Sequence, residues 1–424
     1  MRFTFGRVWA PQAIRATLLA TAAMAAALLG SATLVPTTAW AGVTDTLPKG
    51  AFLIDMAYTI ATTDKQYDGN RKEIPLLEPI ERYEAGAGLQ GVLRASPTVD
   101  MRMLISQLMY GITDKWVLAL AVPTSISTTI APNLGWTPGD YNGSLGRPYS
   151  EQDFWEWAGS MGQRKPKDVW VGNRWTPADI VIGSRLRLPE NAFMERHLLR
   201  WTVMLQGALP TGREVDPEEI IELGTTGWYL HNYGDLELHL AGDWRLRDAE
   251  GVDRLTVGVE AWYAWLRTRT YKTPTGSKNP LLMTYAPYVG DTFEVNGGDW
   301  QAGRVSVDAV PLIGPTFGTW MTKGSRALAL KFPPMLSLNV MYDYVHLSPS
   351  RWQSRYPLWS LNQARFWGEG EKHVFTAMAT LSLLRVGAPL QFYVKQRSLD
   401  IIAGRNMRPA NATTFGARLL VKFW

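Results

Sequence analysis

The feature that most constrains this chain is a strict alternation of apolar and polar residues over long segments. In residues 235–246, one parity holds Leu236, Leu238, Leu240, Trp244 and Leu246, and the other holds Glu237, His239, Asp243 and Arg245. Successive side chains of a β-strand point to opposite faces of the sheet. The pattern therefore predicts a strand with one face in an apolar phase and the other face in a polar phase.

Such segments recur along the chain. We predict strands near residues 51–62, 99–111, 116–128, 179–189, 198–209, 234–247, 254–267, 301–312, 334–347, 372–386, 389–400 and 412–424. Strands of globular proteins centre near about 5 to 6 residues, whereas a tilted strand that crosses a bilayer needs about 9 to 11. A soluble sandwich also alternates, but the length of these segments favours strands that cross a membrane.

The connections alternate in length. The gaps 63–98, 129–178, 210–233, 268–300, 348–371 and 401–411 are long, and the gaps 112–115, 190–197, 248–253 and 387–388 are short. Outer-membrane barrels have short periplasmic turns and long extracellular loops. Two regions do not fit this alternation of long and short connections. The gap 313–333 is long where a turn is expected, and the strip 83–94 could be a further strand.

These patterns predict the fold class. An unpaired backbone group in hydrocarbon costs several kcal/mol, so strands span a bilayer only as a closed barrel. We therefore predict an all-β protein, a transmembrane antiparallel β-barrel of about 12 strands with a range of about 10 to 14, oily outside and polar inside.

The first residues predict export. Arg2, Arg7 and Arg15 precede an alanine-rich apolar run from Ala16 to about Leu29, and Ala39 and Ala41 form a small-residue cleavage site. We expect residues 1–41 to be a removed signal peptide and residues 42–424 to be the barrel with its extracellular loops, in the outer membrane of a Gram-negative bacterium. The alternative, a helical membrane anchor, needs a longer apolar run.

Charge and composition exclude several classes of function. Without the leader, the formal net charge falls from +5 to +2, which gives no reason to expect a nucleic-acid partner. The chain has no cysteine, so it has no disulfide or thiolate metal site. The 19 tryptophans, 16 tyrosines and 13 phenylalanines suit a membrane protein, because aromatic rings gather at the two interfaces of a bilayer.

The polar parity of the strands predicts the side chains of the lumen. They are Arg185, Arg187, Arg200, Glu237, His239, Asp243, Arg245, Glu260, Lys395, Arg397, Arg418 and Lys422. The cations could form a ladder that selects an anionic solute, or they could pair with acids of neighbouring strands and fill the barrel. Because an eight-stranded interior is just filled and sixteen or more strands leave a channel, we favour a narrow or plugged pore.

The longest loop, residues 131–177, is rich in aromatic residues, Trp155 and Trp157 among them. Loops of this length are functional or disordered, and so many aromatic residues argue against disorder. Two interpretations stay open: a lid that contacts the ligand, for which stacking would suit flat apolar solutes, or a plain surface loop.

The final strand ends with TTFGARLLVKFW. Phe415, Leu419, Val421 and Phe423 are expected to face lipid, and Arg418 and Lys422 the lumen. The ending resembles the C-terminal strand by which outer-membrane proteins are recognised for assembly. It departs from that pattern because the apolar set counts back from Phe423, whereas the last residue is Trp424.

Three stretches carry a family resemblance: LMYGITDKWVLALAVP around Tyr110, PADIVIGSRLRL, and WTVMLQGALPTGR. Over about residues 101–213 they resemble the outer-membrane family of meta-pathway phenol-degradation proteins, with Ala178 where the family has glycine. The resemblance implies a barrel that carries hydrophobic or aromatic compounds across the outer membrane. Each piece also has a plain structural explanation, since Thr113, Asp114 and Pro210 are common turn residues.

The expected function is passive uptake of a small hydrophobic or aromatic solute by a protein that is not an enzyme and holds no cofactor or metal. Its expected partners are outer-membrane lipid, the assembly machinery and the solute. One alternative is a structural or adhesive barrel with a closed lumen. Another is a hydrolase that uses His239 or His346, but no G-x-S-x-G or H-E-x-x-H motif is present.

Overall fold

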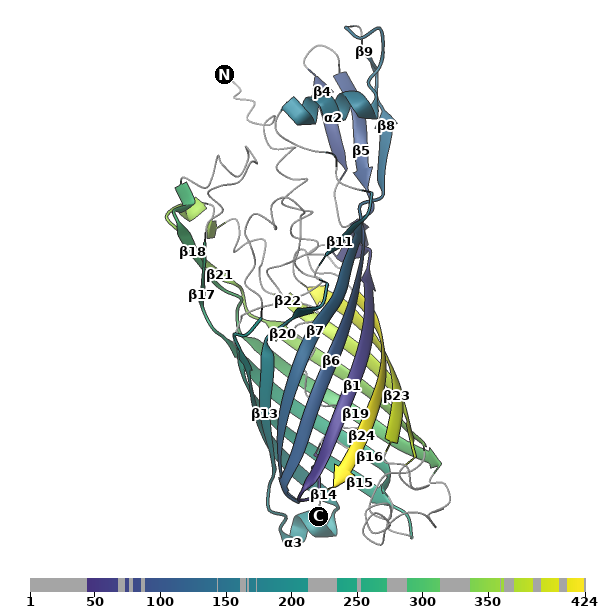
Figure 1. Ribbon diagram of the computed structural model, residues 1–424, viewed down its shortest axis with the longest axis vertical. Helices are drawn as coiled ribbons and strands as arrows, with labels where there is room; N and C mark the ends of the chain where they lie inside the picture. Colours follow the sequence, from purple (N-terminus) through teal and green to yellow (C-terminus); the bar gives the residue numbers. More distant parts are fainter. Residues whose placement is uncertain are drawn as a thin grey trace.

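The computed structural model describes residues 44–67, 73–75, 79–84, 88–142, 144–160, 165, 168–172, 174–212, 235–249, 253–272, 288–312, 336–358, 360–361, 370–383, 390–403 and 410–422. They form a β-barrel with a tall module that rises from one side of its wall (Figure 1). Among the described residues, no helix is long and apolar enough to cross a membrane.

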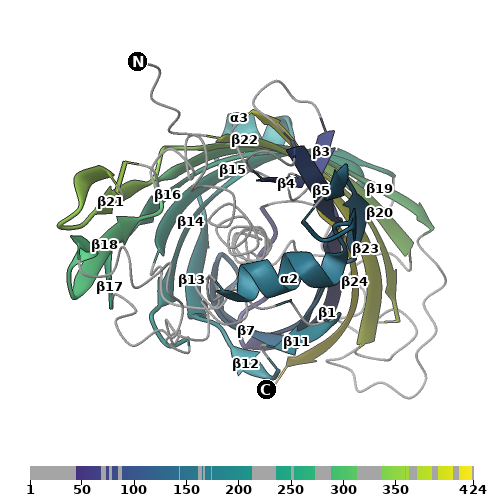
Figure 2. The same cartoon turned by 90° about the horizontal axis from the view of Figure 1, so that it is seen from above.

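Twelve antiparallel strands form the barrel, and each pairs with two neighbours. In order around the wall they are β1 (Ala51–Thr63), β6 (Thr98–Thr113), β7 (Trp116–Ala131), β13 (Ile180–Arg187), β14 (Leu199–Leu209), β15 (Asp235–Arg247), β16 (Asp253–Leu266), β19 (Trp300–Leu312), β20 (Leu336–Leu347), β22 (Gly370–Ser382), β23 (Leu390–Ala403) and β24 (Ala410–Lys422). The last strand pairs with the first, and the wall forms a ring when seen from above (Figure 2).

The predicted fold class is confirmed. Each predicted segment coincides with one barrel strand, and the bounds differ by a few residues. The barrel closes at a seam between β1 and β24, where Asp55 lies opposite Arg418. Closure leaves no row of unpaired backbone groups, which is the condition for a sheet in hydrocarbon.

The outer surface of the barrel is apolar. Large exposed side chains on it include Ile54, Met56, Leu108, Leu118, Leu205, Leu238, Leu240, Val305, Val340, Phe375, Phe392 and Phe415. Exposed aromatic side chains flank this band, with Trp116 and Trp244 toward one end and Trp265 and Tyr344 toward the other. A band of this kind between two aromatic girdles is typical of outer-membrane barrels. The prediction for Phe415 is confirmed, whereas Phe423 and the side chain of Lys422 lie outside the described residues.

The two ends of the barrel differ. At one end, which we call the turn end, residues 114–115 join β6 to β7, residues 188–198 join β13 to β14 with helix α3 (Ala192–Arg196), and residues 248–252 join β15 to β16. The opposite end, the loop end, carries the long connections. Residues 313–335 join β19 to β20 and lie outside the described residues, so the hairpin that their length suggests stays a prediction.

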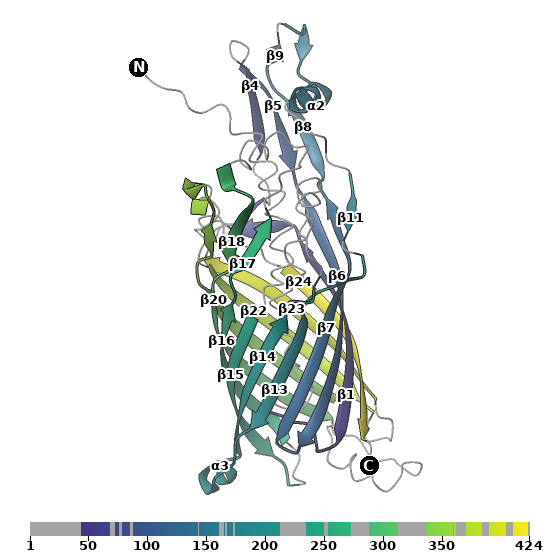
Figure 3. The same ribbon diagram turned by 60° about the vertical axis from the view of Figure 1, so that its left-hand side comes forward.

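The tall module continues the β6–β7 hairpin beyond the barrel (Figures 1 and 3). Strand β5 (Gly88–Ala95) pairs with β8 (Leu134–Pro138) just past the ends of β6 and β7, and β4 (Ile80–Glu84) adds a third strand. Helix α2 (Glu151–Ser160) packs on this sheet through Phe154 and Ala158. Two short strands, β9 (Tyr141–Asn142) and β10 (Arg147–Pro148), precede the helix. The strip 83–94 therefore belongs to the module and adds no strand to the barrel.

Other loop-end segments also form small sheets. Strand β11 (Trp170–Gly172) and strand β12 (Thr176–Pro177) pair with the upper part of β7. Strands β17 (Arg269–Lys272), β18 (Thr292–Asn296) and β21 (Arg351–Gln353) form a second sheet over a cluster of Val289, Phe293 and Val295. Strands β2 (Lys65–Tyr67) and β3 (Glu73–Pro75) form a short pair.

Candidate functional site: the lumen

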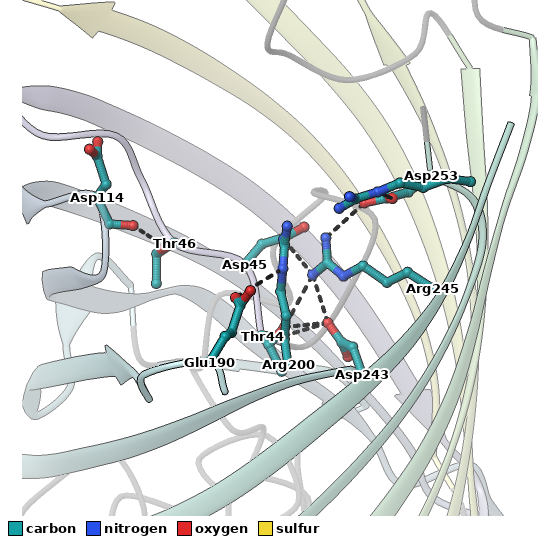
Figure 4. Close-up of polar contacts among 10 residues, drawn as sticks. Thr44, Asp45, Thr46, Asp114, Glu190, Arg200, Asp243, Arg245 and Asp253 are labelled. Atoms are coloured by element: carbon teal, nitrogen blue, oxygen red, sulfur yellow. Dashed lines mark hydrogen bonds and ion pairs between the residues drawn. The ribbon is translucent and has the colours of Figure 1, made fainter. Parts of the chain in front are cut away.

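Residues 44–50, which we call the N-terminal segment, run into the lumen at the turn end. Near β1, the segment is held by the β6–β7 turn: Lys49 N donates to Asp114 Oδ1 at 2.9 Å, and Thr46 Oγ1 donates to the Asp114 carbonyl at 2.8 Å. At its other end, Thr44 donates to Asp243 Oδ2 from its backbone nitrogen at 3.0 Å and from its hydroxyl at 2.5 Å. Asp243 lies on β15, several strands away from β1, so the segment crosses the lumen (Figure 4).

A charge cluster anchors this segment to the wall. Arg245 Nη2 lies 2.7 Å from Asp45 Oδ1 and 2.8 Å from Asp243 Oδ2, and its Nη1 lies 2.9 Å from Asp253 Oδ2. Arg200 lies between Asp45, at 3.8 Å, and Glu190, at 3.5 Å. These lumen arginines were predicted, and the cluster pairs them with acids (Figure 4). Pairing is the arrangement expected for buried charges.

The N-terminal segment also has an apolar anchor. Leu47 is buried in a cluster with Ala51, Leu53, Met109, Val117 and Leu420, at the turn end of β1, β6, β7 and β24. The segment is thus fixed by ion pairs on one wall and by apolar packing on another. The segment therefore occupies part of the lumen at the turn end, and the narrow or plugged pore stays a prediction.

A second network lies deeper in the lumen, around His239. Its Nε2 is 2.9 Å from Glu237 Oε2, its Nδ1 is 2.9 Å from Glu260 Oε1, and its ring stacks on Trp262 at 5.5 Å. Arg304 continues the network, with Nη1 3.0 Å from Glu260 Oε2 and Nε 2.6 Å from Asp343 Oδ1. Both ring nitrogens of His239 face carboxylates, so this geometry gives a rigid polar wall and does not activate a hydroxyl nucleophile.

Arg304, Asp343 and Asp55 were not among the predicted site residues. Each nevertheless occupies the lumen parity of its strand, between residues such as Val305 and Val340 that face outward. The alternation that identified Glu237 and His239 could have identified them too. No comparable signal marked Thr44 and Asp45, which precede the first strand.

The lumen wall formed by β1, β6 and β7 is largely apolar, although Asp55, Thr59, Thr63, Gln107, Ser125 and Thr128 also face inward. Its inward side chains include Leu53, Ala57, Ala61, Val99, Met101, Met103, Met109, Val117, Ala121 and Ile130, all buried. We call this surface the apolar wall. The expectation of a polar interior is met only in part here. The reason is that these inward residues pack on one another, and those at the turn end also pack on Leu47 of the N-terminal segment. They are therefore shielded from water.

The predicted residues Trp155 and Trp157 lie on α2, in the module above the loop end. Trp155 Nε1 donates to Glu151 Oε1 at 3.0 Å, and the guanidinium of Arg82 lies 4.4 Å from the centre of the Trp157 ring. Both rings pack against the buried Phe154. The loop thus has a folded core of its own, and the view from above places α2 across the opening of the barrel (Figure 2).

The start of α2 depends on Asp153. Ser150 and Asp153 form a capping box, in which the Ser150 backbone nitrogen donates to Asp153 Oδ2 at 2.7 Å and Asp153 N donates to Ser150 Oγ at 3.3 Å. Arg147 makes two further bonds to the same carboxylate, at 2.5 and 2.8 Å. Hydrogen bonds from Arg147 and Ser150 hold the pKa of Asp153 well below its ordinary range.

We expect Asp153→Asn to weaken α2 by about 0.5 to 2 kcal/mol, the usual cost of losing a helix cap. Hydrogen exchange should accelerate in residues 151–160 and stay unchanged in β15 and β16. Glu156→Gln is the matched control, because Glu156 accepts only an exposed bond from Gln152, 2.9 Å long, on the same helix. Equal acceleration in both variants would contradict the assignment.

The lowered pKa also sets the pH dependence of the module. A carboxyl whose pKa is lowered in the folded state stabilises that state above its unfolded pKa of about 3.9, and the contribution is lost as the pH falls below that value. The protection of α2 should therefore be the same at pH 7 and pH 5.

Comparison with known proteins gives the fold and no family. No protein-family model and no curated protein matches the chain, so membership of the phenol-degradation family stays a prediction. An outer membrane channel from Pseudomonas putida F1 matches over 90% of this chain and 98% of its own, with a TM-score of 0.50 and 11% sequence identity.

Two more distant matches are the CymD monoaromatic hydrocarbon channel and the KdgM porin in complex with disordered oligogalacturonate. CymD has a TM-score of 0.32 and 7% identity, over 89% of each chain. KdgM has a TM-score of 0.34 and 6% identity, over 87% of this chain and 98% of its own. TM-scores this low give no evidence that these two proteins share a function with this chain. The closed barrel and the Pseudomonas putida match together show that this chain has the fold of an outer-membrane channel.

Proposed function

We propose that the protein is an outer-membrane channel for the passive uptake of small hydrophobic or aromatic compounds. The apolar wall carries this proposal. A channel for hydrophilic solutes needs polar groups around its path, whereas the lumen faces of β1, β6 and β7 consist mostly of methionine, leucine, valine and alanine side chains, with fewer polar ones. Apolar solutes gain free energy by leaving water for such a surface.

The orientation follows from the connections. By the rule for outer-membrane barrels, the turn end lies in the periplasm and the loop end outside the cell. A solute would then arrive beside the module and reach the N-terminal segment last. In this proposal, a leader of residues 1–41 directs export, and β24 presents the chain to the assembly machinery.

The test is the uptake of an uncharged aromatic dye, N-phenyl-1-naphthylamine, by Gram-negative cells that express the protein. The dye brightens in apolar surroundings, and an intact lipopolysaccharide leaflet slows its entry. We expect the protein to raise the initial uptake rate and Ala121→Asp, which places a carboxylate on the apolar wall, to abolish most of the increase.

Thr376→Asp is the matched control, because it places the same carboxylate in the lumen on β22, opposite Arg397. We expect this variant to behave like the wild type. The amount of folded protein is compared on unheated gels. No gain in uptake with the wild-type protein would contradict the proposal and favour a closed structural or adhesive barrel.

A further inference from the structure

Among the described residues, four cations of the lumen have no counter-ion within ion-pair distance. Arg185 on β13, Lys372 on β22, and Lys395 and Arg397 on β23 make no ion pair with any residue that the structure describes. Other lumen arginines are paired: Arg200, Arg245, Arg304 and Arg418 each lie within 4 Å of at least one carboxylate. The sequence left a cation ladder and paired charges as alternatives, and the barrel contains both arrangements on different strands.

The unpaired cations are not exposed surface groups. Lys372 is 5% exposed, and its ammonium lies 5.4 Å from the centre of the Trp300 ring. Arg185 is 7% exposed; among the described residues, its Nη2 contacts the sulfur of Met204 at 3.7 Å and its Nη1 is buried without a hydrogen-bond partner. Burying a charge without an opposite charge is unfavourable. Ionisable groups kept at membrane depth usually serve a solute or ion path.

The positions of these cations follow the barrel axis. Strand β22 runs from the loop end to the turn end, and Lys372 lies near its start. Arg397 lies opposite Thr376 and Lys395 opposite Met378, each further toward the turn end. Arg397 and Lys395 are two residues apart on one face, which separates their Cα atoms by about 6.6 Å. The cations of β22 and β23 therefore descend in steps that a single anionic group could follow.

Arg185 also lies toward the turn end, but on β13, which is five strands from β23 around the wall. It stands opposite Val117, the second residue of β7, near the turn end. It borders a recess lined by Gln107, Met109, Val117, Val181, Met204 and Gln206, whose free space is about 20 Å³. That space admits about one water-sized group. The recess therefore suits one oxygen of a head group, while the body of a solute stays against the apolar wall.

We propose that the solute is an apolar compound that carries one carboxylate, and that Lys372, Arg397, Lys395 and Arg185 bind this carboxylate in turn. The inference rests on the proposed function and narrows its substrate class. A carboxylate matches both cation types, since guanidinium and ammonium groups form charge-assisted hydrogen bonds with it. The apolar body of the same molecule finds the apolar wall in the same lumen.

The test is calorimetric binding by the full-length protein in a nonionic detergent. The probes are 4-phenylbutyrate and 4-phenylbutan-1-ol, which share a body and differ in the head group. We expect the acid to bind wild-type protein about tenfold more tightly or better, because a charge-assisted pair is replaced by a neutral contact. Dodecanoate is the second acid, and its affinity shows whether an aryl or an alkyl body is preferred.

The variant Lys395→Gln/Arg397→Gln should lose about tenfold or more in affinity for the acid and keep its affinity for the alcohol. Arg185→Gln should show the same selective loss. Lys115→Gln/Arg174→Gln removes the same charge from two exposed positions outside the lumen and should bind both probes like the wild type.

The outcomes separate this inference from the proposed function. Equal binding of acid and alcohol by the wild type would overturn the carboxylate inference and leave the hydrophobic channel standing. Binding of neither probe would count against both. Preference for the acid that persists in every lumen variant would overturn the assignment of these cations. The wild-type comparison decides the head group even where a variant does not fold.

Discussion

Replacing Asp55 with leucine is expected to destabilise the barrel by about 3 to 5 kcal/mol, the usual result of removing one partner of a buried ion pair. Asp55 on β1 accepts from Arg418 Nε on β24 at 2.8 Å and from the Tyr393 hydroxyl on β23 at 3.0 Å. Arg418 is 3% exposed and also lies 4.2 Å from the centre of the Tyr393 ring. The bond spans the seam, so its loss weakens closure itself. Urea unfolding in lipid vesicles, followed by tryptophan fluorescence, measures the change.

The double variant Asp55→Leu/Arg418→Met provides the control. Replacing a buried pair with apolar residues of similar volume is often neutral or stabilising. We therefore expect the double variant to recover most of the stability lost in Asp55→Leu. Loss of the same size in both variants would show that the cost comes from altered packing and that the seam does not depend on the ion pair.

Releasing the N-terminal segment is expected to raise ion conductance several-fold. Replacing residues 44–47 with Gly-Ser-Gly-Ser removes the bonds of Thr44 to Asp243, the ion pairs of Asp45 and the packing of Leu47. Without these anchors, the entropy gained by a free chain outweighs the remaining contacts. The segment should then leave the lumen at the turn end. Single-channel recording in planar bilayers measures the result.

A matched change at the turn end provides the control for this experiment. Replacing Glu195 and Arg196 of α3 with serine alters the turn end outside the lumen, and we expect conductance like that of the wild type. Unchanged conductance after release of the segment would mean that other groups close the lumen. The idea that residues 44–50 form its main obstruction would then be wrong.

Most of the barrel could be predicted from the sequence because every barrel strand has one face toward lipid and the other toward the lumen. Lipid and lumen impose opposite demands on successive residues, so Leu238 and His239 differ in the sequence as their surroundings differ in space. Strand bounds were less certain than strand identity. The predicted segment 372–386 extends past the end of β22 at Ser382, because apolar residues continue beyond that strand.

The sequence could not predict features that depend on distant contacts. The helical start at Ser150 and Asp153 is a local signal, but the sheet that α2 packs on comes from residues 80–95 and 134–138. The apolar wall was hidden for a different reason. In β6, the inward residues Val99, Met101 and Met103 alternate with Asp100 and Arg102, and such alternation shows which residues share a face but leaves open which face meets water.

Among the candidate residues, alternation predicted which charges share the lumen face and left their partners open. His239, Glu237 and Glu260 meet because β15 and β16 align His239 with Trp262 and bring Glu260 alongside. That alignment is a property of register, which a single strand does not specify. For the same reason, the separation of paired arginines from unpaired cations became visible only in the assembled barrel.

The N-terminal segment constrains the order in which the barrel is assembled. Thr44 bonds to a residue 199 positions further along the chain, and β1 finds its partner β24 only after every other strand has been made. Contacts so distant in sequence form slowly. The segment can bind Asp243 only after β15 has joined the wall, so the lumen is filled late in folding. A barrel in which this contact does not form would keep residues 44–50 outside the lumen and would be leaky.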